Sequence, residues 1–134
     1  MSGGQVVHPV SLIDIFPTFV DICQLDGDNR KDQAGFKMGG FSLKPFIEDP
    51  NTEKWPGPDG ALTAIATDVV DYELSTQTFA YRTANYRYIM YPNSQEEFYD
   101  LQHDLYEWNN LTVQANYEAR KKEMKQFILD LINQ

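Results

Sequence analysis

Cysteine is nearly absent from this sequence, since Cys23 is the single thiol among 134 residues. One cysteine excludes an intrachain disulfide and a cysteine-rich zinc site. Because Cys23 falls on the apolar face of an expected helix, we interpret it as a buried thiol rather than a nucleophile. The two histidines are too far apart for a local metal motif. His103 is expected on the surface, and His8, just before Pro9, is the better functional candidate.

The chain also lacks long apolar runs and an excess of positive charge. No stretch approaches the 18 or more apolar residues of a membrane span, so the sequence predicts a soluble segment. The formal net charge is -9, which disfavours nucleic acid and anionic membranes as partners, because both would be repelled at long range. The length suits one ordinary domain, which buries roughly two-thirds of its unfolded surface.

Positive charge is missing most clearly from residues 92–110, which are followed by a basic helix. This segment contains no Lys or Arg and five acidic residues: Glu96, Glu97, Asp100, Asp104 and Glu107. It could bind a cation, or it could be a solvated turn whose carboxylates cap backbone amides and pair with the helix. The second interpretation is favoured, because Ca²⁺ loops need glycine at the bend and no glycine follows Gly60.

Turn and capping residues organise the first 60 residues. Ser11 and Asp14 resemble a capping box, and Pro17 suits the first position of a short helix because its missing N–H needs no partner there. Ser42 can cap a second helical turn. The expected elements are a helix over 17–23, a loop over 26–40, a helical turn through Ile47 and a stiff connector over 49–60 that contains three prolines.

After residue 60 the apolar period changes to two, which predicts strands. The expected strands are 62–67, 78–83, 86–91 and 97–100, joined by short polar links that suit antiparallel hairpins. A helix over 117–133 with Asn116 as its N-cap follows. Its apolar stripe predicts packing on the sheet, so the fold class is α+β with about four antiparallel strands. We expect the sheet to keep an uncovered apolar face or edge, because Phe79, Tyr81, Tyr88 and Ile89 give it mixed apolar and tyrosine faces.

Three motifs occur in order along the chain, over residues 9–18, 40–46 and 86–111. The run from Tyr86 to Leu111 reads Y-R-Y-I-M-Y-P-N-S-Q-E-E-F-Y-D-L-Q-H-D-L-Y-E-W-N-N-L. It resembles the closing strand pair and acidic loop in the C-terminal region of the sulfatases, except that Leu105 stands where proline is usual in that family. Residues 9–18 resemble the family element P-V-S-L-x-D-x-x-P-T, and residues 40–46 resemble its G-x-S-L-x-P turn.

The resemblance implies that residues 1–134 are the single C-terminal subdomain of a type I, formylglycine-dependent sulfatase of the alkaline phosphatase superfamily. Iduronate-2-sulfatase-like and arylsulfatase-like enzymes are the similar groups. Residues 1–60 would be a lead-in and residues 61–134 the sheet and helix. The family motif C/S-x-P-x-R does not occur here, and the start at Met1 fits an internal stretch. The catalytic and metal-binding residues would therefore lie upstream.

The resemblance further implies a parent that is a sulfuric ester hydrolase acting on sulfated carbohydrate, periplasmic or secreted. It would use formylglycine and a divalent cation, commonly Ca²⁺, both supplied by an upstream catalytic domain that is the partner of this chain. One alternative is the same subdomain of a phosphatase or phosphonate hydrolase of the superfamily. Another is a stand-alone, non-catalytic binding module.

The loop over 68–77, D-V-V-D-Y-E-L-S-T-Q, is the expected substrate-binding element, because it mixes carboxylates, an aromatic ring and hydroxyls. Its proposed sugar contacts are Asp68, Asp71, Tyr72 and Gln77, and the alternative is a plain surface connection. Arg82 and Arg87 could bind sulfate, but ion pairs with Glu96 and Glu97 are the commoner outcome for paired strands.

Overall fold

The computed structural model describes residues 3–26, 28, 30, 34–35, 39–66 and 73–133. The chain divides into two compact units, Met1–Asp59 and Gly60–Gln134, and each is described by itself. Within the described residues, no helix is both long enough and apolar enough to cross a membrane.

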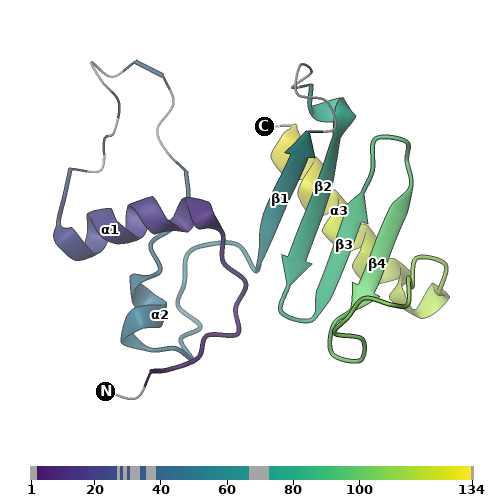
Figure 1. Ribbon diagram of the computed structural model, residues 1–134, viewed down its shortest axis with the longest axis horizontal. Helices are drawn as coiled ribbons and strands as arrows, with labels where there is room; N and C mark the ends of the chain where they lie inside the picture. Colours follow the sequence, from purple (N-terminus) through teal and green to yellow (C-terminus); the bar gives the residue numbers. More distant parts are fainter. Residues whose placement is uncertain are drawn as a thin grey trace. The chain divides into compact units, whose positions relative to one another are not determined.

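The second unit is an antiparallel sheet with a helix across one face (Figure 1). Its strands are β1 (Gly60–Ala66), β2 (Gln77–Thr83), β3 (Tyr86–Met90) and β4 (Glu96–Asp100), and they lie side by side in chain order. Helix α3 (Glu118–Ile132) follows, after a 3-10 turn over Ala115–Tyr117. The predicted α+β class, the four-stranded antiparallel sheet and the C-terminal helix are therefore confirmed.

The core lies between the sheet and α3. Alternate residues of β2, β3 and β4 point toward the helix, as the period of two requires. The buried cluster is Phe79, Tyr81, Tyr88, Phe98, Met124 and Ile128. Tyr81 stacks on Phe127 of α3 with ring centroids 4.2 Å apart. Full burial of each side chain in this cluster stabilises the fold by roughly 1.5 to 3 kcal/mol. The interface between the sheet and α3 is therefore the main stabilising contact of the unit.

The predicted uncovered face or edge of the sheet is not formed by Phe79, Tyr81, Tyr88 and Ile89, all of which are buried. The first three are 2%, 4% and 0% exposed because α3 covers them. Ile89 has the opposite strand parity and belongs to a smaller buried cluster with Tyr99 and Leu101. The four residues therefore lie on two different faces of the sheet, and the alternation does not say which face the helix covers.

The first unit contains a 3-10 turn (Leu12–Asp14), α1 (Ile15–Cys23) and α2 (Lys44–Glu48). The Asp14 carboxylate is the centre of the unit: it accepts the backbone N–H of Ser11 at 2.8 Å, as in the predicted capping box, and that of Phe41 at 2.9 Å. Gly40 has φ +100, and a Cβ there would lie 2.3 Å from the Ile13 carbonyl oxygen. Only glycine allows this approach.

Several predicted helix starts are shifted. Helix α1 begins at Ile15, so Pro17 is its third residue, where its missing N–H still needs no intrahelical partner. The residue that caps α2 is Leu43, although the Ser42 hydroxyl still accepts the Lys44 N–H at 3.2 Å. Tyr117 and not Asn116 precedes α3, because a 3-10 turn leads into the helix.

The prediction that Cys23 is buried is also wrong. Cys23 is exposed, and α1 has no buried residue. The large apolar side chains around it are exposed as well, with Phe19 at 59% and Ile22 at 49%. The helix has the apolar face that the pattern predicted, but the described residues do not cover it.

Candidate functional site

A hollow of about 270 Å³ opens at the end of the sheet where β2 begins and β3 ends. Its apolar part comes from Leu74, Phe79, Met90 and Ile132, and its polar part includes Ser75, Gln77 and Glu96. The 3-10 turn Leu74–Thr76 brings Ser75 to the rim directly before β2. An apolar floor with a few convergent polar groups is the usual composition of a small-molecule site, and this volume lies just below the usual range of roughly 300 to 1,000 Å³.

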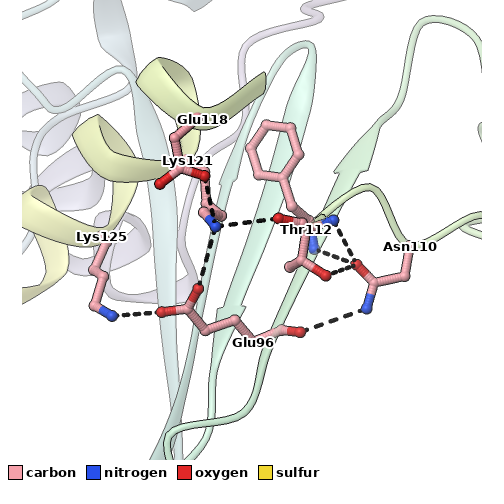
Figure 2. A network of polar contacts seen from close by, with 7 residues as sticks. Glu96, Asn110, Thr112, Glu118, Lys121 and Lys125 are labelled. Carbon is pink, nitrogen blue, oxygen red and sulfur yellow. Dashed lines mark hydrogen bonds and ion pairs between the residues drawn. The ribbon is translucent and has the colours of Figure 1, made fainter. Parts of the chain in front are cut away.

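Figure 2 shows the charged network at this hollow, which joins β4 to α3. The Glu96 carboxylate accepts a hydrogen bond from the Lys125 ammonium group, and Lys121 Nζ lies 3.7 Å from its other oxygen. Lys121 also contacts Glu118 at 2.9 Å and donates to the Thr112 carbonyl at 3.1 Å. The network therefore fixes the side of α3 that borders the hollow.

Burial and charge act in opposite directions on Glu96. Burial raises its pKa, but the hydrogen bond from Lys125 and the charges of Lys125 and Lys121 outweigh this effect and hold the pKa below its ordinary value. Burial and the Glu96 carboxylate raise the pKa of Tyr88 in turn. The hydroxyl of Tyr88 is buried and reaches no partner of standard hydrogen-bond geometry among the described residues. Glu96 is therefore ionised at neutral pH and compensates the positive charge of Lys125.

Of the four predicted sugar contacts, Gln77 is the one that the structure describes. It lies in the hollow, at the first position of β2 and opposite Ala66 of β1. Asp68, Asp71 and Tyr72 lie outside the described residues. Glu96 and Lys125 were not predicted as site residues. They are 29 positions apart, and no local spacing in the sequence signals that β4 and α3 bring them together.

The two arginines lie directly opposite each other on β2 and β3. Arg87 pairs with Glu107, since its Nη1 lies 3.0 and 2.9 Å from the two carboxylate oxygens. The prediction of an ion pair was therefore right for Arg87, but its partner is Glu107 of the loop after β4 and not Glu96 or Glu97. Glu96 and Glu97 have other partners. Glu96 binds Lys125, and Glu97 accepts from the hydroxyls of Tyr91 and Tyr99.

The acidic segment acts as a set of caps and pairs, as its favoured interpretation predicted. Asp100 is 3% exposed and accepts from the Gln102 N–H, the Tyr117 hydroxyl and the His103 ring. Asp104 accepts the Asn109 N–H at 2.7 Å. His103 is on the surface, as predicted, with its side chain 80% exposed. Across the described ranges, no three His, Cys, Asp or Glu side chains gather as a metal site would require.

Asn110 begins a sequence that fits a glycosylation acceptor, but its amide has a structural role. Its Oδ1 accepts the backbone N–H of Phe98 on the free edge of β4, and also the N–H and hydroxyl of Thr112 (Figure 2). Leu111 N–H then donates to the Phe98 carbonyl at 2.8 Å. The segment after the acidic loop therefore extends the sheet pairing past β4.

A second hollow, of about 360 Å³, lies within the first unit and includes His8, Val10, Thr18 and Phe46. The His8 ring packs against Phe46 and Trp55, with centroids 5.3 and 4.8 Å apart, and its Nδ1 lies 2.8 Å from the Pro9 carbonyl oxygen. Among the residues of this unit that the structure describes, neither Lys nor Arg lines the hollow. His8 packs there against two aromatic rings.

Comparison with known families decides what the chain is part of. The family model for N-sulphoglucosamine sulphohydrolase, C-terminal, matches residues 2–134. The chain belongs to this sulfatase family. The resemblance to the C-terminal region of sulfatases is thereby confirmed. No curated protein matches the chain significantly.

Solved structures share the fold of this sulfatase domain. A protein determined in complex with its substrate D-glucosamine-2-N,6-O-disulfate is 24% identical, with a TM-score of 0.66 over 88% of this chain and 23% of its own. A 2-O GAG sulfatase is 22% identical, with a TM-score of 0.71 over 97% of this chain and 26% of its own. The phosphonate monoester hydrolase of Agrobacterium radiobacter is 26% identical, with a TM-score of 0.66 over 88% and 24%. The chain thus spans about a quarter of each.

Proposed function

We propose that the complete protein carrying this sulfatase domain is a sulfuric ester hydrolase that acts on sulfated carbohydrate. The observation that carries the proposal is the family match over residues 2–134. Two of the similar structures support the substrate class, since one holds a sulfated glucosamine as its substrate and the other is a GAG sulfatase.

The part played by this chain is to complete the fold and to form the substrate-binding rim. Gln77 in the hollow can exchange hydrogen bonds with a sugar hydroxyl, because its amide both donates and accepts. Lys125, at the edge of the same hollow with its side chain 43% exposed, can donate a second N–H of its ammonium group to a sulfate oxygen while the first stays bound to Glu96. Asp68, Asp71 and Tyr72 of the preceding loop are proposed as further sugar contacts.

The reacting groups are proposed to come from elsewhere in the complete protein. The sulfatase resemblance implies formylglycine and a divalent cation such as Ca²⁺. The residues of this chain do not fit either group, since the motif that yields formylglycine does not occur in the sequence and the described part of the chain gathers no metal-ligand cluster. We therefore assign no catalytic residue to residues 1–134.

A phosphonate monoester hydrolase is the second candidate. One such enzyme has the same TM-score, 0.66, as the protein solved with the sulfated glucosamine, and its identity is slightly higher, at 26% against 24%. The hollow itself does not separate the two candidates, because Lys125 would attract a phosphonate oxygen as well as a sulfate oxygen.

The experiment that separates them gives the complete protein two substrates, a sulfated glucosamine and an aryl phosphonate monoester. Inorganic sulfate and the released phenol are measured against a heat-denatured control. The proposal expects sulfate release with the higher kcat/KM. Preferential hydrolysis of the phosphonate would support the second candidate, and hydrolysis of neither ester would reject both.

A further inference from the structure

The loop between β4 and α3 exposes two aromatic rings that are stacked on each other. The centroids of Tyr106 and Trp108 are 5.5 Å apart and their planes are inclined by 23°. Tyr106 is 74% exposed and Trp108 is 82% exposed. Keeping this much aromatic surface in water is unfavourable, and the tyrosines of the sheet, such as Tyr81 and Tyr88, are buried.

The loop holds the two rings in a fixed position. Glu107, which lies between them, has φ +59, a conformation that costs free energy in any residue except glycine. Arg87 fixes this residue through contacts with both oxygens of its carboxylate. Asp104 fixes the other end of the loop by accepting the backbone N–H and the side-chain amide of Asn109. Rings that are already ordered lose little entropy when a ligand binds.

The surroundings of the rings decide which ligand they suit. Flat aromatic faces stack with nucleobases, with cations and with the apolar faces of sugar rings. Residues 92–110 contain no Lys or Arg that could bind an anionic ligand such as a nucleic acid or a sulfated sugar residue. The two loop carboxylates nearest the rings in sequence already have partners, since Glu107 pairs with Arg87 and Asp104 accepts from Asn109, so neither is left unpaired for a cation. The exposed imidazole of His103, beside Asp104, can form hydrogen bonds with hydroxyl groups. An uncharged, hydroxyl-rich ring matches this combination.

We infer that Tyr106 and Trp108 form a binding subsite for an uncharged sugar residue of a polysaccharide. The inference rests on the proposed function for the class of substrate, since a carbohydrate polymer carries further sugar residues beyond the sulfated one. It adds a second contact region to the hollow at Gln77. The subsite would bind the polymer and take no part in the chemistry at sulfur.

The test measures binding of the complete protein to an uncharged oligomer of N-acetylglucosamine by isothermal titration calorimetry. We expect Trp108→Ala to weaken binding by about three- to tenfold, as the loss of one aromatic contact would. Tyr106→Ala should act in the same direction, and Trp108→Phe should retain most of the affinity. Leu105→Ala is the matched control, because Leu105 is an apolar residue of the same loop and is 66% exposed.

Two results would overturn the inference. If Trp108→Ala and Tyr106→Ala both leave binding unchanged, the rings do not contact sugar. If Leu105→Ala weakens binding as much as Trp108→Ala, the loop is a general apolar surface. Turnover of a small aryl sulfate in the same variants tests the proposed function separately. A protein that hydrolyses no sulfate ester but loses sugar binding in Trp108→Ala would reject the proposed function and retain the inference.

Discussion

Replacing Asn110 by alanine tests whether a side chain completes the free edge of β4. The variant removes the acceptor of the Phe98 N–H, which is 3.2 Å from Oδ1, and of the Thr112 N–H, which is 3.0 Å from it. It also removes the bond from Nδ2 to the Glu96 carbonyl oxygen. The Phe98 side chain is fully buried, so its N–H is the group that water replaces least well.

The magnitude follows from these contacts. Leaving a buried donor unpaired costs about 1 to 3 kcal/mol, whereas exposed hydrogen bonds are partly replaced by water. We therefore expect Asn110→Ala to lower the free energy of unfolding by about 2 kcal/mol, with most of the loss coming from the Phe98 N–H. Asn110→Asp keeps the acceptor and should lose less.

Urea unfolding of the 134-residue chain, followed by far-ultraviolet circular dichroism, measures the effect. Thr112→Val is the matched control, because it removes the exposed hydroxyl contact with Oδ1 and leaves the Phe98 bond intact. It also disrupts the glycosylation sequence, so it separates a structural role from a role in modification. Equal stabilities of Asn110→Ala and Thr112→Val would refute the argument.

Three further predictions concern stability and activity. Acidification should destabilise the chain, because the fold holds the pKa values of Glu96 and Asp100 below their ordinary 4.5 and 3.8. The two carboxylates stabilise the fold at pH values above those ordinary pKa values. This stabilisation is lost as the pH falls through their lower pKa values in the folded state. Glu96→Gln should make unfolding free energy less dependent on pH between about 3 and 5, and an unchanged slope would contradict the role of Glu96. Ile128→Ala should lower the free energy of unfolding in urea by about 2 to 5 kcal/mol, since Ile128 is 0% exposed. Leu131→Ala is the control, because Leu131 is 41% exposed. Similar losses in the two variants would contradict the packing of α3 on the sheet. The 134-residue chain alone should hydrolyse no aryl sulfate in the presence of Ca²⁺, and turnover above the buffer blank would show that catalytic groups lie within it.

The sheet could be predicted from the sequence because its signals are local. The ends of the four strands were placed within two residues of their positions in the structure, since alternation and short polar links define them. The helix start at α3 was misplaced because a 3-10 turn and an α-helical turn share residue preferences. The sequence could not say which face α3 covers, because both faces of β3 carry large side chains, Tyr88 on one and Ile89 on the other.

Of the residues that line the candidate site, the sequence pointed to Gln77, because it ends a loop rich in groups that bind sugars. Its contact with a sugar stays a prediction. Lys125 and Glu96 were missed because their contact depends on the packing of α3 against β4. The partner of Arg87 was missed for a similar reason, since Glu107 comes back to β3 only through the fold of the acidic loop.

The central claim is that this chain contributes to substrate recognition while the chemistry at sulfur is performed elsewhere in the complete protein. Its most direct test is a comparison of Gln77→Ala with the unmodified protein on a sulfated glucosamine and on a small aryl sulfate. Loss of one hydrogen bond to a sugar hydroxyl should raise KM for the sugar by about three- to tenfold. The account predicts this rise with nearly unchanged kcat and with unchanged kinetics on the aryl sulfate. Equal losses on both substrates would contradict it.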